Sequence, residues 1–182
     1  MSRPGGALQV AGSLSLTALV AVCVRTQFGA PMVVGSDAMA PALRRGDVVW
    51  VDRGGGSALR AGAVVAYRPT VGAGLTMKRV VAGPGQVVEF ASGRLVLDGV
   101  PRGTATEEAW CGQPVVVRPG TDAAAVTVPR GAAYLLGDDR RVSGDSRQWG
   151  PVDASTVVGR VRLVLWGAGG PSAVPACDAT VM

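Results

Sequence analysis

The chain contains a single lysine, Lys78, and no histidine. The absence of histidine excludes a Ser-His-Asp triad, a Cys-His pair and a histidine-ligated metal site. Every other basic residue is an arginine, whose guanidinium keeps its proton, whereas a desolvated lysine amine can lose one. Lys78 is therefore the candidate general base of this sequence. The alternative is a surface lysine that escaped an arginine-biased composition.

Three separated segments carry side chains suited to a serine/lysine hydrolase. Residues 35–43 read GSDAMAPAL and are followed by RRGDVVWV; residues 77–85 read MKRVVAGPG; residues 137–152 read GDDRRVSGDSRQWGPV. In this order they resemble three boxes of the type I signal peptidases: Ser-Met-x-Pro-Thr-Leu, Lys-Arg-Val-x-Gly-x-Pro-Gly and Gly-Asp-Asn-Arg...Ser-x-Asp-Ser-Arg. The resemblance extends over roughly residues 33–166 and is most specific in the third segment.

The resemblance implies a role for each site residue. A serine hydroxyl is a weak nucleophile that needs a neighbouring base, and Lys78 stands at the position of that base. Ser36 would lend its hydroxyl to the oxyanion hole together with the backbone N–H of residue 38, and Ser143 would orient the Lys78 amine. No metal or cofactor is implied. The remaining assignments are a charged cluster of Asp138, Asp145 and Arg147 that holds the third segment against the site, and loop geometry set by Met39 and Pro41.

Ala38 stands where the family has its nucleophilic serine. A methyl group cannot attack a carbonyl, so we expect a site with its base and oxyanion donors that is inactive as written. Two explanations remain open: an inactivating substitution in an otherwise active peptidase, or a naturally degenerate member that binds without cutting. Ser36 would have to shift by two residues, roughly 6 to 7 Å along an extended chain, to replace the nucleophile. Ala42 and Asp139 are milder departures, since the family has Thr and Asn there.

The composition favours β-structure. Hydrophobic residues make up 48% of the chain but aromatic residues only 4%, so valine, alanine and leucine must fill the core, and valine favours strands. Short apolar runs alternate with Gly and Pro, and no apolar stripe at helical spacing follows residue 24. We therefore expect a mainly β fold of coiled antiparallel sheets, of the signal-peptidase type, over residues 30–168. The runs lie at 31–36, 46–53, 62–69, 77–83, 86–90, 94–99, 113–119, 124–129, 132–138 and 157–166.

Residues 7–24 carry no charge, and their length is near the lower limit for a transmembrane helix. They predict an anchor that follows a short tail at residues 1–6, with a cleaved secretory signal as the alternative. One arginine flanks this segment on each side, so the distribution of positive charge hardly indicates which end of the anchor faces the cytoplasm. The resemblance implies a single-pass protein of the cell membrane with an extracytoplasmic catalytic domain. Residues 169–182, rich in Gly, Pro and Ala, are expected to be loosely ordered, and Cys111 and Cys177 are a possible disulfide pair.

The function implied by the resemblance is that of a membrane serine endopeptidase removing leader peptides from exported proteins. Its partners would be signal peptides and the lipid bilayer. The net charge of +5 does not indicate nucleic acid, because the arginines are scattered and no aromatic platform accompanies them. The alternative is a non-catalytic pseudoprotease that binds exported peptides or a membrane partner. A self-cleaving Ser/Lys repressor is disfavoured, because no helix-turn-helix pattern is present.

Overall fold

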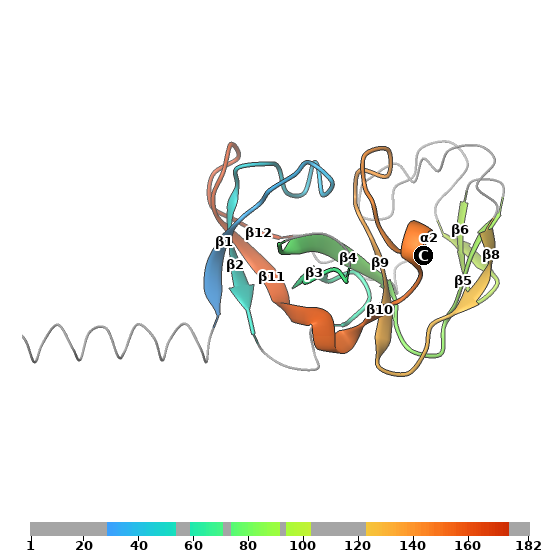
Figure 1. Ribbon diagram of the computed structural model, residues 1–182. Coiled ribbons are helices and arrows are strands. Elements are labelled where there is room, and N and C mark those ends of the chain that lie inside the picture. Colours follow the sequence, from blue (N-terminus) through green and yellow to red (C-terminus); the bar gives the residue numbers. More distant parts are fainter. Residues whose placement is uncertain (1–28, 54–58, 71–73, 92–93, 103–122, 175–182) are drawn as a thin grey trace, which may run out of the picture.

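The fold is built from two antiparallel β-sheets, seen in a computed structural model of the chain (Figure 1). The structure describes residues 29–53, 59–70, 74–91, 94–102 and 123–174. The larger sheet runs in the order β1 (Ala30–Val33), β2 (Val48–Asp52), β11 (Val157–Trp166), β3 (Val64–Tyr67), β4 (Thr76–Ala82), β9 (Ala132–Leu136) and β10 (Val152–Asp153), and β12 (Ser172–Ala173) pairs with β11. The smaller sheet has the order β7 (Val100–Arg102), β6 (Arg94–Leu97), β5 (Val87–Ala91) and β8 (Ala123–Thr127).

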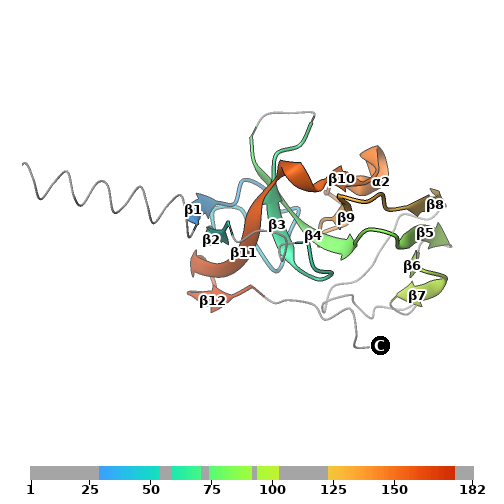
Figure 2. The same cartoon turned by 90° about the horizontal axis from the view of Figure 1, so that it is seen from below.

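Helical structure is confined to two short segments within the described residues: α2 (Ser146–Trp149) and the 3₁₀ turn η1 (Ala154–Thr156). Both views of the molecule place the smaller sheet at the end of the domain opposite β1, β2 and β12 (Figures 1 and 2). Every pair of neighbouring strands among the described ranges is antiparallel. The expected mainly β, antiparallel fold is therefore confirmed.

The expected strand runs coincide with strands wherever the structure describes them. The run at 113–119, the anchor at 7–24 and both Cys111 and Cys177 lie outside the described residues. None of the described helices is long and apolar enough to cross a bilayer. Within the tail that was expected to be loosely ordered, β12 pairs with Leu163 and Val164 of β11, and Val174 is buried.

The central strand β3 is buried on both faces, which explains why four successive residues are apolar. Val64 and Ala66 belong to one apolar cluster, whereas Val65 and Tyr67 belong to another on the opposite face. The next strand, β4, is also buried along almost its whole length. A charged side chain in β4 therefore has no solvated face to occupy.

Candidate active site

Lys78 lies in the middle of β4, between strands β3 and β9. It pairs with Val65 of β3 and is only 3% exposed. Burial lowers the pKa of its amine; the charge of Asp145 opposes this shift, and that of Arg147 adds to it. Desolvation disfavours the charged form of an amine. The fold thus shifts the Lys78 amine in the direction that a general base requires.

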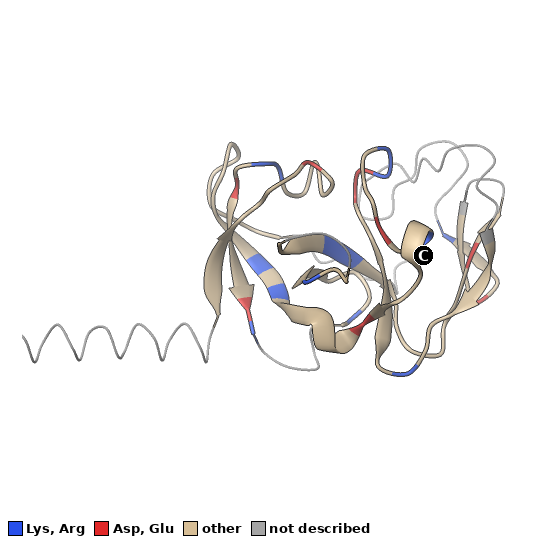
Figure 3. Cartoon of the chain, in the orientation of Figure 1, with Lys and Arg blue, Asp and Glu red and all other residues tan. Residues whose placement is uncertain are grey.

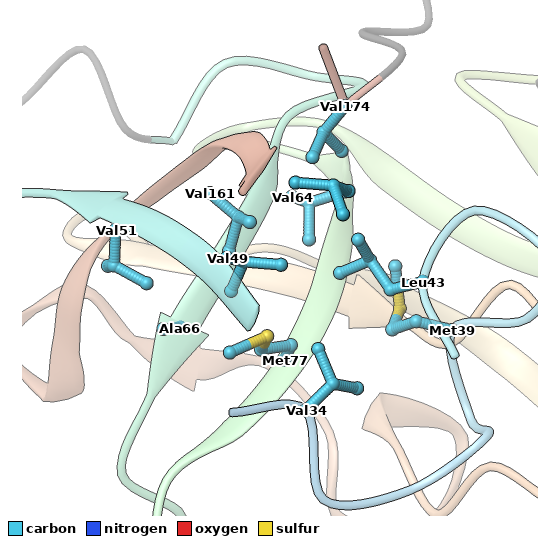
Figure 4. Close-up of a cluster of buried hydrophobic side chains, with 11 residues drawn as sticks. Val34, Met39, Leu43, Val49, Val51, Val64, Ala66, Met77, Val161 and Val174 are labelled. Atoms are coloured by element: carbon cyan, nitrogen blue, oxygen red, sulfur yellow. The ribbon is translucent and has the colours of Figure 1, made fainter. Parts of the chain in front are cut away.

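The segment carrying Ala38 is fastened to the core by its apolar neighbours. Met39 and Leu43 are buried in the same cluster as Met77, the residue before Lys78, as Figure 4 shows. The Leu43 N–H donates to the Met39 carbonyl at 2.8 Å and closes the turn. Met39, expected to set loop geometry, is a core residue in the structure. Ala38 and Lys78 each adjoin a methionine of one cluster, so this packing ties their two segments together.

Pro41 belongs to the same turn and follows a cis peptide bond. Asp37 holds the turn from the other side: its side chain accepts from the Arg45 N–H at 3.0 Å, and its carbonyl accepts from the Ala40 N–H at 2.9 Å. Ser36 is exposed at the start of the turn. Within the described part of the chain no hydrogen bond joins it to the other site residues, so its oxyanion role stays a prediction.

The third segment meets the Ala38 turn at Gly137. The Asp139 N–H donates to the Ala38 carbonyl at 3.1 Å. A Cβ on Gly137 would overlap the Ser143 side chain and lie 2.6 Å from the carbonyl oxygen of Ala38. Glycine is required here because the two segments approach the backbone so closely. The Ser143 side chain and the Ala38 carbonyl therefore both lie next to Gly137.

Asp138 joins the third segment to the base strand through a buried ion pair. Arg79, the residue after Lys78, donates from Nε to Asp138 Oδ1 at 2.8 Å and from Nη2 to Oδ2 at 2.7 Å. Its Nη1 donates to the Gly62 carbonyl at 2.8 Å. Two parallel charge-assisted bonds of this kind are strong and directional. Sequence reasoning assigned Asp138 to the charged cluster but did not identify Arg79 as its partner.

Asp145 organises the turn that carries Ser143. Its carboxylate is fully buried, pairs with Arg147 at 2.8 and 3.0 Å, and accepts from the Gly137 N–H at 3.0 Å. Arg147 also donates to the main-chain carbonyls of Arg140 and Ser143. Burial alone would raise the pKa of Asp145, but the hydrogen bonds and charge of Arg147, with the Gly137 N–H and Ser143, outweigh it and lower the pKa. Two members of the expected charged cluster, Asp145 and Arg147, thus pair with each other.

Ser143 and Ser146 are both buried in this turn. The Ser143 side chain forms a hydrogen bond that helps to lower the pKa of Asp145. Ser146 Oγ accepts from the Leu135 N–H of β9 at 2.9 Å and fixes the start of α2 against the sheet. Sequence reasoning gave Ser146 no role, although its place in the Asp-Ser-Arg triplet was a usable signal.

Comparison with known proteins gives matches along most of the chain. A family model described as "Signal peptidase, peptidase S26" matches residues 7–166. The chain is 29% identical over 157 residues to a probable signal peptidase I-1 of Synechocystis sp., covering 80% of this chain and 76% of that protein. It is 26% identical over 164 residues to a signal peptidase I of Leptolyngbya laminosa, covering 85% and 77%. A crystal structure of a signal peptidase I from Enterococcus faecalis aligns with a TM-score of 0.41 at 23% identity, covering 56% of this chain and 94% of that one.

Proposed function

Because this chain belongs to the peptidase S26 family of signal peptidases, we propose that it carries a Ser/Lys leader-peptidase site with Lys78 as base and residue 38 at the nucleophile position. The observation that carries this proposal is the burial of Lys78 with a lowered pKa. The packing of Met39 with Met77 supports it, since it ties the segment of residue 38 to the strand of the base.

With serine at position 38, the neutral Lys78 amine would take the hydroxyl proton as the oxygen attacks the scissile carbonyl. The backbone N–H of residue 38 and the Ser36 hydroxyl would stabilise the oxyanion. Protonated Lys78 would then give its proton to the leaving amine, and a water activated by the same lysine would hydrolyse the acyl-enzyme. Ser143 would hold the Lys78 amine in position throughout.

With alanine at position 38 the covalent step has no nucleophile, so the chain as written would bind a leader peptide without cutting it. The bound peptide would lie extended, with small side chains at positions −1 and −3 in shallow pockets, as in the family. Residues 7–24 would cross the cell membrane once as an anchor, and the catalytic domain would lie on the extracytoplasmic side. The partners would then be signal peptides of exported proteins and the bilayer.

The test restores the serine hydroxyl at position 38. Ala38→Ser should cleave a leader-bearing substrate in detergent or lipid, with the product mass locating the cut. Lys78→Met in that background should lower the rate by at least about a hundredfold, the smaller end of what a general base contributes. Ala40→Ser is the matched control, because it adds the same hydroxyl two residues along the same turn and should give no cleavage.

The second candidate is a pseudoprotease, favoured by the additional replacement at Ala42. It predicts leader-peptide binding by the folded chain with no turnover even after Ala38→Ser. A folded, peptide-binding Ala38→Ser variant without activity would therefore reject the catalytic proposal and keep the binding one. Activity that survives Lys78→Met would reject Lys78 as the base.

A further inference from the structure

A basic hollow lies beside the turn that carries Ser143. It has a volume of about 390 Å³ and is lined by residues 140–144 together with Arg147 and Gln148. Figure 3 shows basic and acidic positions in close succession along this connection between β9 and α2. Most of these charges neutralise one another in pairs, and the exception indicates what the hollow can bind.

Arg140 is the exception. The other arginines of this region are each paired with an aspartate: Arg79 with Asp138, Arg147 with Asp145 and Arg141 with Asp139. Arg140 forms no ion pair with the described residues, although it is only 8% exposed. Its Nη1 is buried and has no hydrogen-bond partner in the part of the chain that the structure describes.

A buried guanidinium nitrogen without an acceptor is costly, because it has lost its water and gained no hydrogen bond. Burial lowers the pKa of Arg140 to about 10; the charges of Asp145 and Asp138 oppose this shift, and those of Arg147 and Arg79 add to it. The group still remains charged near neutral pH. An anion in the hollow that Arg140 lines would balance its charge.

We propose that this hollow binds a carboxylate of a peptide, held against the guanidinium of Arg140. The guanidinium fork matches the two oxygens of a carboxylate. A monoanion is favoured over a phosphate dianion because, of the three arginines that line the hollow, only Arg140 has no ion-pair partner among the described residues. The exposed side chain of Val142, 64% accessible at the edge of the hollow, offers apolar contact to the methylenes that carry such a carboxylate.

The experiment measures equilibrium binding to the full chain in detergent micelles, so it needs no nucleophile and stands apart from the proposed catalysis. Backbone amide shifts of residues 140–148 would be followed by NMR. The probes are N-acetylglutamate amide for a side-chain carboxylate, N-acetylglycine for a chain-terminal carboxylate, and N-acetylglutamine amide as the neutral isostere. Saturable shifts with either carboxylate and none with the isostere are expected, and the better carboxylate identifies its source.

Arg140→Gln should weaken carboxylate binding by about ten- to a hundredfold, the range for a lost hydrogen bond to a charged group. Arg130→Gln is the matched control, because it removes the same charge from an exposed turn outside the hollow, and it should bind as the parent chain does. Equal binding of the neutral isostere, tighter binding of inorganic phosphate, or equal losses in both variants would overturn the assignment. The comparison of N-acetylglutamate amide with N-acetylglutamine amide on the parent chain tests the proposed carboxylate site even if Arg140→Gln does not fold.

Discussion

Asp138 and Asp139 are adjacent acidic residues that hold arginines in very different surroundings. The Arg79–Asp138 pair is buried, with side chains 2% and 3% exposed, whereas Arg141 in the Arg141–Asp139 pair is 75% exposed. Asp138→Asn and Asp139→Asn therefore make the same chemical change one residue apart. We predict that they differ strongly in their effect on the free energy of unfolding.

The magnitude follows from the bonds that Asp138 makes. Asn at position 138 can accept one hydrogen bond from Arg79 with its carbonyl oxygen, but its NH₂ group faces the second guanidinium nitrogen, donor against donor. The substitution also removes the negative charge that neutralises Arg79. Breaking one partner of a buried ion pair typically costs about 3 to 5 kcal/mol. For a domain of this size, that loss corresponds to a fall in Tm of roughly 6 to 20 °C. The exposed pair contributes little, since solvent screens it.

The assay is thermal and urea unfolding of the two variants and the parent chain, followed by circular dichroism. Asp138→Asn should lower both Tm and the urea midpoint at an unchanged m-value, while Asp139→Asn should stay close to the parent. Arg79→Met combined with Asp138→Asn should cost less than the sum of the single changes, because the two residues act on one interaction. Equal effects of the two asparagine variants, or strict additivity in the cycle, would refute the assignment of this pair as the link between β4 and the third segment.

Three further predictions concern the same site. Because Lys78 is the only lysine, ¹⁵N-lysine labelling gives a single side-chain amine signal, and its titration should lie below the usual pKa of 10.5 because of burial; an ordinary value would contradict the burial argument. The lowered pKa of Asp145 stabilises the fold above pH 3.8, and this contribution is lost as pH falls through the folded-state pKa. Asp145→Asn should therefore flatten the loss of stability on acidification, and an unchanged pH profile would count against it. Gly137→Ala should destabilise by about 1 to 3 kcal/mol through overlap with its neighbours, whereas Gly83→Ala, with open space around its Cβ position, should unfold like the parent chain.

The strands could be predicted because their sequence pattern is local. Val64 to Tyr67 is a short apolar run bounded by Gly and Pro, and both features appear in the sequence before any tertiary contact is known. The pairing of β12 with β11 could not be foreseen, because Ser172 and Ala173 have no strand preference of their own. Their order comes from the partner strand and from burial of Val174.

The contacts of the site could not be predicted from the sequence, because they join residues that are distant along the chain. Asp138 is 59 residues from Arg79, and several aspartates of the third segment were equally plausible acceptors on sequence alone. Met39 likewise looked like a turn residue, because a single methionine in a turn has no periodicity that marks it as core. Its contact with the cluster of Met77 exists only after β4 is folded against the turn.

The charges around Lys78 explain why its burial decides the direction of its pKa. Asp145 and Asp138 raise that pKa, while Arg147 and Arg140 lower it, so the charges around the amine oppose one another. Desolvation is then the largest influence left. A carboxylate bound at Arg140 would offset one of the two lowering charges and raise the pKa of Lys78, so occupation of the hollow would make the lysine a poorer base at neutral pH.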